Sequence, residues 1–528
     1  MAYIKRLIIE GFKKIKNLDL TLDQKMNILV GENETGKSTI IEAINIVLNQ
    51  DYKNAEKNIL KELFNITNIE NFYSNPSVET LPKIKITIEF EMVKEDGRIA
   101  DFYGMENTFK VPCYGITFEC KFNEEFKEEL ADEIKNKNIP YEYYQLTWVT
   151  FAGIPYNYLK KAFKYLSIDN SNTESNNTYN YYNKSIFNSS YDSSSRMKYK
   201  NCFNNQLNSV LNDLELSDID DTQKFGINSK KVNLENVLTI YQNKIPIENL
   251  GKGMENILKT KNALNKSKTK LDIISIEEPE NHLSHLNLRN MIETIVKNSS
   301  QSQLIITTHS NLVTNGLGLK NVIFLSSDKN DVKITKFSTI QDDTQQFFEK
   351  ADNSNLLQFI LSKKAILVEG NTEYMLVPTI FKKETSETIF ENGIDVISCG
   401  GVSYKRYLEI ANILNKKVAV ITDNDKKDNK IKEVNEFNNA NNSIKIFLDN
   451  SIDNWTWEVC IYNLNKKIFD SNIIIDPKFD YLFNGNNYGK VLGYMLNNKT
   501  EVAYLILVNN LNINYPQHIK DAIKWIKE

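Results

Sequence analysis

Two sets of residues in this 528-residue chain have the types and spacing that phosphate chemistry requires. The first is a glycine loop, G-E-N-E-T-G-K-S-T at Gly31–Thr39, which follows the apolar run Met26–Val30 and precedes the helical spacing of Ile40–Leu48. A strand, a glycine loop and a helix in this order let backbone N–H groups face the phosphates of a nucleoside triphosphate. In such a loop the lysine reaches the outer phosphates and the following hydroxyl holds Mg²⁺. The predicted nucleotide contacts are therefore Asn33, Gly36, Lys37, Ser38 and Thr39.

The second set consists of carboxylates that follow two apolar runs in the last third of the chain. Glu369 comes directly after Ala365–Val368, and Asp423 and Asp425 come after Val418–Thr422. Carboxylates at i and i+2 beyond a strand can converge on one ion, and hard oxygen ligands select Mg²⁺ or Mn²⁺. Glu373, one turn into the next helix, could serve a second ion or transfer a proton. Taken alone, D-x-D after a strand is equally typical of a turn that caps a helix.

A further group of motifs lies between residues 247 and 310. Gly251 and Gly253 open a helix, and the apolar run Leu271–Ile276 ends in Glu277-Glu278-Pro279-Glu280. Adjacent carboxylates at the carboxyl end of a parallel strand lie where α/β sheets bind their ligands. We expect Glu277 to hold Mg²⁺ through water and Glu278 to polarise the attacking water.

Three of the four histidines fall in this same stretch. His309 ends the apolar run Leu304–Thr308, a position from which it could contact the γ-phosphate or the attacking water; a purely structural role is the alternative. His282 and His285 have i, i+3 spacing, but no third ligand accompanies them, so we reject a metal site there. Glu280 fits the cap of the following helix.

Alternating and continuous apolar runs predict the elements that position these residues. Tyr3–Phe12 and Ile15–Leu22 alternate and should pair as strands, and three later runs should form a half-exposed antiparallel sheet: Ile84–Glu91, Ile116–Phe122 and Tyr143–Phe151. Glu124–Asn138 reads as a charged helix. Strand–helix alternation resumes beyond residue 345 and predicts a second, smaller α/β domain with a mostly parallel sheet.

The segment between the two halves of the nucleotide domain is less regular. Ser167–Ser195 is rich in Asn, Ser and Tyr and predicts a long surface loop, whereas Asn205–Leu216 and Val232–Tyr241 could be helical or extended. This insertion is either a dimerisation or regulatory arm, or a loose surface elaboration.

Composition limits the class of protein. The length predicts two or three domains, and 41% apolar residues suffice for packed cores. No apolar run is long enough to cross a membrane, and five scattered cysteines predict reduced thiols and a cytoplasmic protein. The net charge of −4 argues against a large non-specific DNA surface but permits a local basic groove.

Four of these stretches resemble motifs of the ABC-type ATPases related to SMC and RecF proteins. Gly31–Ser38 resembles Walker A, Gly251–Glu255 the signature, Ile276–Glu280 Walker B and Thr307–Ser310 the switch histidine. The resemblance implies that the signature of one subunit closes over ATP bound to another, in a head-to-head homodimer or higher homo-oligomer. Asn249 and Glu255 stand where Ser and Gln are more usual, which bears on how tightly such a dimer closes.

E-G-N-T-E at Glu369–Glu373 and D-N-D at Asp423–Asp425 resemble the TOPRIM domain of topoisomerases, primases and certain nucleases. ATPase motifs followed by TOPRIM resemble the OLD (overcoming lysogenisation defect) nucleases, a family that includes the nuclease of the Gabija anti-phage system. Three shorter stretches are also similar to that family: 400–407, 455–458 and 516–520.

The resemblance to OLD nucleases implies roles for particular residues. Glu369, Asp423 and Asp425 would bind the catalytic ions, and Glu373 and Glu458 would assist. Lys520 would stabilise the charged transition state. Glu458 could instead be a packed helix residue, and Lys520 one more solvated lysine.

We therefore expect four segments: 1–165, the first part of the ATPase domain; 166–240, an inserted dimerisation region; 241–345, the second part of the ATPase domain; and 346–528, a TOPRIM domain. The predicted function is an ATP-dependent or ATP-regulated endonuclease acting on double-stranded DNA, with ATP and Mg²⁺ or Mn²⁺ as cofactors. An anti-phage role and a helicase-like partner protein follow from the resemblance alone. The alternative is a DNA-clamping or sensor ATPase whose TOPRIM domain binds without cutting.

Overall fold

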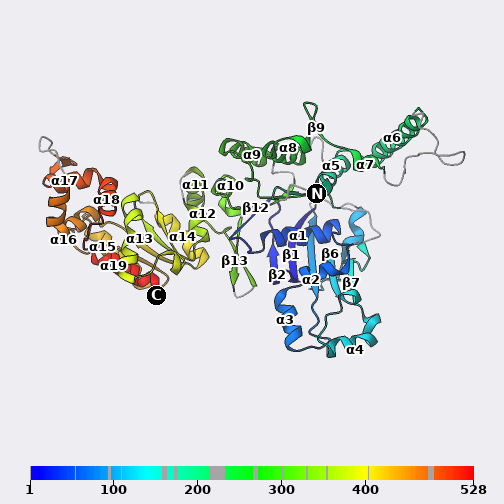
Figure 1. The fold of residues 1–528 in the computed structure, drawn as a ribbon, viewed down its shortest axis with the longest axis horizontal. Coiled ribbons are helices and arrows are strands. Elements are labelled where there is room, and N and C mark those ends of the chain that lie inside the picture. Colours follow the sequence, from blue (N-terminus) through cyan, green and yellow to red (C-terminus); the bar gives the residue numbers. More distant parts are fainter. Residues whose placement is uncertain are drawn as a thin grey trace. The chain divides into compact units, whose positions relative to one another are not determined.

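The computed structural model describes residues 2–53, 55–92, 97–108, 110–156, 163–171, 176–213, 232–265, 271–298, 302–328, 331–351, 355–401, 404–473 and 481–528. The chain divides into two compact units, Met1–Ser338 and Thr339–Glu528 (Figure 1). Residues 339–345, which we expected to end the ATPase domain, lie in the second unit, where α11 (Asp342–Lys350) forms. Each unit has its own hydrophobic core.

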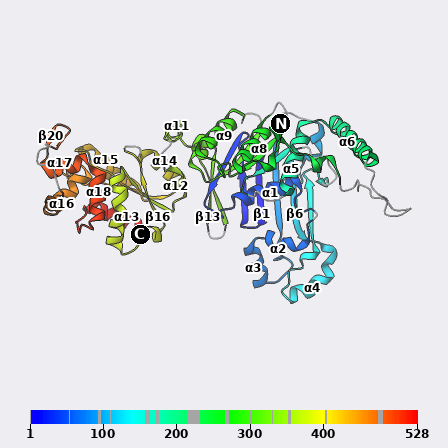
Figure 2. The same ribbon diagram turned by 45° about the horizontal axis from the view of Figure 1, so that its top comes forward.

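Unit 1 contains the expected antiparallel sheet, with strand order β2-β1-β4-β6-β5 and β7 paired to β6. Its strands are β1 (Ala2–Phe12), β2 (Ile15–Thr21), β4 (Ile84–Met92), β5 (Tyr103–Gly104), β6 (Cys113–Phe122) and β7 (Tyr144–Thr150). Ile84, Ile86 and Ile88 are buried while Lys85 and Glu89 are partly exposed, as alternation predicts, although Thr87 on the polar face is also buried. Figure 2 shows α2 (Leu60–Leu63), α3 (Ile66–Ser74) and α4 (Lys127–Lys135) grouped at one end of this sheet.

A second sheet of unit 1 carries the nucleotide motifs. Its order is β14-β13-β3-β12-β11-β8, and all neighbours pair in parallel except β13 and β14. The strands are β3 (Met26–Gly31), β8 (Tyr165–Asp169), β11 (Ile273–Glu277), β12 (Gln303–Thr308), β13 (Val322–Asp328) and β14 (Asp331–Lys336). Every residue of β3, β11 and β12 is buried, which is typical of a parallel sheet covered on both faces.

Helices cover this parallel sheet and explain why its central strands β3, β11 and β12 are buried throughout. Helix α1 (Lys37–Asn49) packs against strands of both sheets, and its apolar side chains from Ile40 to Leu48 are accordingly buried. Helices α8 (Lys252–Leu264), α9 (His285–Asn298) and α10 (Asn311–Gly316) pack against one another in sequence. The glycine loop and the glutamate motif are thus fixed between rigid elements.

The prediction of a long surface loop at 167–195 was wrong. Its first residues complete β8, a strand of the parallel sheet, and helix α5 (Asn176–Ser190) follows. Tyr179 and Tyr182 are buried, because a tyrosine ring supplies apolar area even where aliphatic residues are scarce. The segment 166–240 that we assigned to an insertion therefore begins inside a strand of the ATPase sheet.

The rest of that segment contains α6 (Ser193–Asp213) and α7 (Leu234–Val237), and the short strands β9 (Tyr241–Gln242) and β10 (Ile245–Pro246) follow it. Residues 214–231 of the predicted arm lie outside the described part of the chain. Although α6 is 21 residues long, no described helix combines the length and hydropathy that a bilayer crossing needs.

Unit 2 is built on a parallel sheet with strand order β16-β15-β17-β18. The strands are β15 (Lys364–Val368), β16 (Ile394–Ser398), β17 (Lys417–Ile421) and β18 (Ile444–Phe447). Its helices are α12 (Leu356–Leu361), α13 (Asn371–Thr385), α14 (Tyr404–Leu414), α15 (Asp428–Ala440), α16 (Trp457–Asn472), α17 (Lys490–Asn497), α18 (Lys499–Val508) and α19 (Gln517–Lys527), with a small hairpin of β19 (Leu482–Phe483) and β20 (Asn486–Asn487). The predicted α/β alternation of this domain is confirmed.

Candidate nucleotide site and candidate metal centre

The glycine loop connects β3 to α1 in the geometry that the sequence predicts. Gly36 has a φ of 96°, a left-handed conformation that glycine adopts without strain. A Cβ on Gly31 would lie 2.5 Å from the Leu325 carbonyl oxygen, so the strand end also requires glycine. The Lys37 ammonium donates to the carbonyl oxygens of Gly31 and Glu32, both at 2.8 Å, and burial lowers its pKa to about 8. These backbone carbonyls satisfy the ammonium without a phosphate, so phosphate binding would exchange one set of oxygens for another.

The glutamate motif lies beside this loop at the end of β11. Glu277 is buried, and its pKa is raised to about 7 by that burial and by the nearby charge of Asp169, whereas a hydrogen bond with the Ser38 hydroxyl opposes the shift. The structure therefore brings together Ser38 and Glu277, the two residues predicted to hold the ATP-associated Mg²⁺.

Glu278 adopts a φ of 45°, and its backbone N–H donates to the Thr307 carbonyl at 3.0 Å. Its Oε1 lies 3.4 Å from His309 Nε2, and Asn281 Nδ2 donates to its Oε2 at 3.0 Å. Burial, with the positive charge of Lys37, lowers the pKa of His309, which keeps the imidazole neutral near pH 7. This arrangement can orient a water for attack.

Glu280 does not act simply as a helix cap. Its Oε1 accepts hydrogen bonds from the Thr308 hydroxyl and the His309 backbone N–H, both at 2.7 Å. It therefore ties the glutamate loop to the end of β12 and fixes the backbone that carries His309.

The signature region has a buried ionic cluster that the sequence did not reveal. Gly251 precedes the first turn of α8, and Glu255 is fully buried, with Lys259 at 2.5 Å and Lys252 at 3.5 Å. The Tyr179 hydroxyl of α5 donates to the same carboxylate at 3.0 Å. A Cβ on Gly253 would lie 2.5 Å from the His282 carbonyl oxygen, so α8 packs closely on the glutamate loop. The unusual glutamate thus pairs with two lysines and links the signature helix to α5.

In unit 2, the parallel sheet brings the predicted carboxylates to one edge. Strands β15 and β17 are neighbours with Val368 opposite Ile421, so Glu369 and Asp423 emerge side by side at the carboxyl ends. The Thr422 hydroxyl donates to Glu369 Oε1 and connects the two strand ends.

Asp423 is held firmly by the start of α16. Its Oδ1 accepts the Trp457 backbone N–H at 2.9 Å, and its Oδ2 accepts the Thr456 hydroxyl at 2.6 Å. Burial raises the pKa of Asp423 to about 7, and the neighbouring charges of Glu369 and Glu458 act in the same direction. Asp423 is therefore fixed in position but poorly compensated in charge.

Glu373 and Glu458 complete the buried acidic group. Glu373 accepts the Gly370 backbone N–H at 3.0 Å, and burial, with repulsion from Glu458 and Glu369, raises its pKa to about 7. Glu458 is 2% exposed, and its Oε2 accepts Lys499 Nζ at 2.7 Å. Its Oε1 is buried and has no hydrogen-bond partner.

The middle residue of D-N-D shapes the loop. Asn424 is fully buried, and its amide donates to the carbonyl oxygens of Asp449 and Ser451, both at 2.8 Å. Asp425 next to it has a φ of 53° and a side chain that is 46% exposed. Lys430 Nζ lies 3.0 Å from Asp425 Oδ2 and 3.8 Å from Glu369 Oε1, and so connects the two carboxylates.

Lys520 does not join this group. Its ammonium lies 3.4 Å from Glu384 in the last turn of α13, whereas Glu373 lies in the first turn of that helix. The lysines beside the carboxylates are Lys499 and Lys430, neither of which a sequence motif indicated. Thr456 lies in the stretch 455–458 that resembles the family, but its hydrogen bond to Asp423 was not predicted.

The carboxylates of unit 2 have the donor atoms of a divalent-ion site. Among the described residues, no three His, Cys, Asp or Glu side chains lie close enough together to form a ready ligand cluster for a metal ion. The donor set nevertheless fits a hard cation, because the buried carboxylates raise one another's pKa and the buried Glu458 Oε1 has no partner. A void of about 10 Å³ against Glu458 and Lys499 is close to the space that a single water needs. A cation held by these carboxylates would relieve this excess of negative charge.

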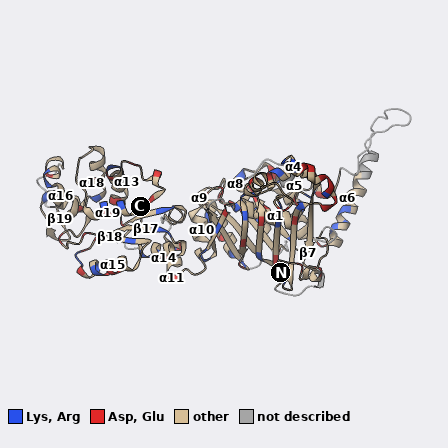
Figure 3. Cartoon of the chain, turned by 90° about the horizontal axis from the view of Figure 1, so that it is seen from below, with Lys and Arg blue, Asp and Glu red and all other residues tan. Residues whose placement is uncertain are grey.

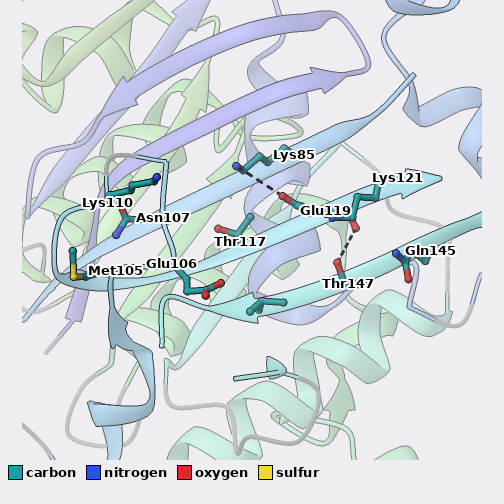
Figure 4. Close-up of a pocket in the computed structure, with 11 residues that line it drawn as sticks. Lys85, Met105, Glu106, Asn107, Lys110, Thr117, Glu119, Lys121, Gln145 and Thr147 are labelled. Carbon is teal, nitrogen blue, oxygen red and sulfur yellow. Dashed lines mark hydrogen bonds and ion pairs between the residues drawn. The ribbon is translucent and has the colours of Figure 1, made fainter. Parts of the chain in front are cut away.

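A larger open hollow of about 720 Å³ lies on the exposed face of the antiparallel sheet (Figure 4). Lys85 and Lys121 line it, but both are paired with Glu119, at 3.8 and 2.9 Å. Basic and acidic residues are likewise interspersed over the elements drawn in Figure 3. The hollow therefore offers no concentrated positive charge for a phosphate.

Comparison with known proteins identifies both units. Residues 2–314 match the AAA ATPase domain family, and residues 360–425 match the overcoming lysogenization defect protein-like TOPRIM domain. The chain is 25% identical over 169 residues to Old nuclease of Escherichia phage P2, a match that covers 30% of this chain and 28% of that protein.

Two shorter matches lie in other curated proteins. The chain is 40% identical over 57 residues to Structural maintenance of chromosomes protein 3 of Saccharomyces cerevisiae, covering 10% of this chain and 5% of that protein. It is 43% identical over 44 residues to DNA replication and repair protein RecF of Rickettsia canadensis, covering 8% of this chain and 12% of that protein. The chain thus spans less than a third of the length of each curated relative.

Matches among solved structures include an SMC head bound to the C-winged helix domain of ScpA, with 12% identity, coverage of 64% of this chain and 100% of that chain, and a TM-score of 0.36. Another is the SMC head domain from Thermotoga maritima, with 15% identity, coverage of 63% and 98%, and a TM-score of 0.31. The predicted order of an ATPase domain followed by a TOPRIM domain is confirmed by the family matches. Since the first of those matches covers more than half of the chain, the chain belongs to the AAA ATPase domain family, and it carries in addition an overcoming lysogenization defect protein-like TOPRIM domain.

Proposed function

We propose that this chain is an ATP-dependent or ATP-regulated DNA endonuclease whose cutting site is the carboxylate group of unit 2. The observation that carries the proposal is the placement of Glu369 and Asp423 at the ends of adjacent parallel strands, with Glu373 and Glu458 near enough to raise the pKa of Asp423. Buried like charges at the ligand-binding edge of a sheet are costly for stability, and a metal site gives a reason for them. Old nuclease, which matches this chain over 169 residues, is a nuclease by name.

In this proposal, Glu369, Asp423 and Asp425 hold the divalent ions, and Glu373 and Glu458 assist. Mg²⁺ or Mn²⁺ would supply charge stabilisation for the attacking and leaving oxygens of a phosphodiester. Thr456 and the Trp457 N–H fix the Asp423 carboxylate, and the Thr422 hydroxyl fixes that of Glu369. Lys499, bonded to Glu458, places a positive charge beside the buried carboxylates. Lys520 would need to leave Glu384 to take the transition-state role that the family resemblance implies.

The ATPase unit would control access of DNA to this site. Lys37, Ser38 and Glu277 would bind ATP with its Mg²⁺, and Glu278 with His309 would activate the attacking water. Two copies of the chain would close on ATP through their signature helices and clamp double-stranded DNA. A cytoplasmic location, an anti-phage role and a helicase-like partner belong to the same proposal and rest on the family resemblance.

Substitution of Asp423 tests the cutting site. Asp423→Asn keeps the shape of the side chain but removes its charge, so we expect plasmid cleavage in Mn²⁺ or Mg²⁺ to fall at least about a hundredfold, since even outer-shell changes at metal sites cost 10- to 100-fold. ATP binding should be unchanged, because Asp423 and the glycine loop belong to different units. Asp428→Asn, on an exposed residue of α15, is the matched control. Full cleavage by Asp423→Asn would remove this residue from the site.

Glu278→Gln tests the ATPase assignment separately. The amide cannot act as a base, so ATP should bind normally while phosphate release falls about a hundredfold or more. Glu293→Gln, on the exposed face of α9, is the control. Normal turnover by Glu278→Gln would show that another residue polarises the water.

A second candidate function is a DNA-clamping ATPase whose TOPRIM domain binds without cutting. The absence of a ready three-ligand cluster among the described residues favours it. Incubation of the chain with plasmid and Mg²⁺ or Mn²⁺, with and without ATP, separates the two functions: metal-dependent binding with no cleavage under any of these conditions would support the clamp.

A further inference from the structure

The contacts of Lys430 explain why the carboxylates of unit 2 form no ready ligand cluster. The ammonium of this residue, on the first turn of α15, is surrounded by three oxygens. It lies 3.0 Å from Asp425 Oδ2, 3.1 Å from Thr422 Oγ1 and 3.8 Å from Glu369 Oε1. Two of these oxygens belong to carboxylates that we assign to the divalent ion.

The position of Lys430 is unfavourable for a lysine by local criteria. The first turn of a helix carries partial positive charge, so a cation there is disfavoured. The Lys430 side chain is nevertheless only 16% exposed, although lysine stems are long enough to keep the ammonium in water. The carboxylates of Asp425 and Glu369 therefore hold the ammonium in place.

An ammonium and a divalent ion cannot share these oxygens. Both are cations, and at a separation of a few ångströms in a half-buried site they repel strongly. Lys430 has no other ion-pair partner among the described residues, and its flexible stem begins near the exposed start of α15. Binding of a metal to Glu369 and Asp425 would thus require this ammonium to swing away.

We propose that Lys430 is a tethered counter-ion, which neutralises Glu369 and Asp425 when no metal is bound and which a divalent ion must displace. The inference rests on the proposed metal centre and adds to it a competitor built into the chain. Its consequence is a pair of effects with opposite signs: loss of the ammonium weakens the metal-free fold but tightens metal binding. A lysine with only a structural role would weaken both.

The test is a calorimetric titration of the full chain with MnCl₂ in the absence of nucleotide. Asp423→Asn provides the reference in which binding at this site is lost. For Lys430→Met, which keeps the length of the stem without the charge, we expect Mn²⁺ to bind about tenfold more tightly than to the unaltered chain, equivalent to about 1.4 kcal/mol. The melting temperature of metal-free Lys430→Met should at the same time be lower.

Two variants serve as controls. Lys430→Arg keeps the charge and should bind Mn²⁺ with an affinity close to that of the unaltered chain. Lys432→Met removes a lysine from an exposed position of the same helix and should change neither quantity.

Equal or weaker Mn²⁺ binding by Lys430→Met, with binding still lost in Asp423→Asn, would overturn the counter-ion role and leave the metal centre standing. If the unaltered chain and Asp423→Asn gave the same titration, the metal centre itself would fail, and the inference with it.

Discussion

At the scale of single residues, unit 2 depends on carboxyl groups placed where their charge is poorly tolerated. Burial raises the pKa of Asp423 from 3.8 to about 7 and that of Glu373 from 4.5 to about 7. Hydrogen bonds from Thr456 and Trp457 hold Asp423 but do not balance its charge. A protein that keeps such groups ionised at neutral pH needs a nearby cation, which the proposed divalent ion would supply.

These raised pKa values predict a pH dependence. Both groups retain protons in the folded chain that the unfolded chain has released, so their contribution to stability is complete below about pH 4 and is lost as the pH rises through about 7. Mn²⁺ must displace the same protons. Saturating Mn²⁺ should therefore raise the melting temperature more at about pH 8 than at about pH 5.5.

Thermal unfolding at the two pH values, with Asp423→Asn for comparison, measures this effect. The variant should show a smaller difference between the two pH values. A Mn²⁺ stabilisation that is equal at both pH values would mean that these carboxyl groups do not bind the ion.

At the scale of elements, helix starts and buried ion pairs position the chemistry. The start of α16 holds Asp423, as the start of α1 forms the predicted phosphate site. In unit 1, α5 and α8 are joined by the Tyr179–Glu255 hydrogen bond and by the pairing of Glu255 with Lys259. The region that we expected to be a peripheral arm is thus attached to the signature helix.

The buried pair of Glu255 and Lys259 predicts that glutamine, which is more usual at the position of Glu255 in related ATPases, is unfavourable here. Glu255→Gln would leave the buried Lys259 ammonium facing a neutral amide, and we expect it to destabilise unit 1 by about 2–3 kcal/mol, since removing one partner of a buried pair is costly. The measurement is denaturant unfolding, followed through the transition that ATP shifts.

Glu293→Gln, whose carboxylate is 67% exposed and pairs with Lys297, should change stability by less than about 0.5 kcal/mol in the same assay. A Glu255→Gln protein as stable as this control would show that the carboxylate charge is not needed at the signature helix.

Sequence reasoning succeeded where the informative residues are contiguous. The glycine loop, the glutamates after β11 and the carboxylates after β15 and β17 were placed correctly, because parallel strands bring their carboxyl ends to one edge. Lys430 and Lys499 were not predicted, because they reach the site through helix packing and have no motif of their own. Thr456 lies in the stretch 455–458 that resembles the family, but no role was predicted for it. Helix α5 was missed because tyrosine and asparagine resemble loop composition, although Tyr179 and Tyr182 are buried.

At the scale of the whole molecule, the chain consists of two units, each with its own core and its own ligand chemistry. The glycine loop lies in the first and the carboxylates in the second. Ligands that bind only the folded state stabilise the unit to which they bind. The effect of nucleotide on thermal unfolding should therefore be separable from the effect of metal.

Differential scanning calorimetry should resolve two unfolding transitions. ATP with Mg²⁺ should raise the first unit's transition, and Mn²⁺ without nucleotide should raise that of the second. Lys37→Ala should abolish the response to ATP, because it removes the ammonium that we propose for the outer phosphates, and should keep the response to Mn²⁺. One transition that both ligands move together would contradict this division of roles.

The most direct measurement of the central claim is a crystal structure of the chain soaked in Mn²⁺, with the ion located by its anomalous scattering. We expect a peak within bonding distance, about 2.0–2.6 Å, of carboxylate oxygens of Glu369 and Asp423, with the Lys430 ammonium moved away from Glu369. Mn²⁺ found elsewhere in the chain but not at these oxygens, with Lys430 still between Asp425 and Glu369, would contradict the account.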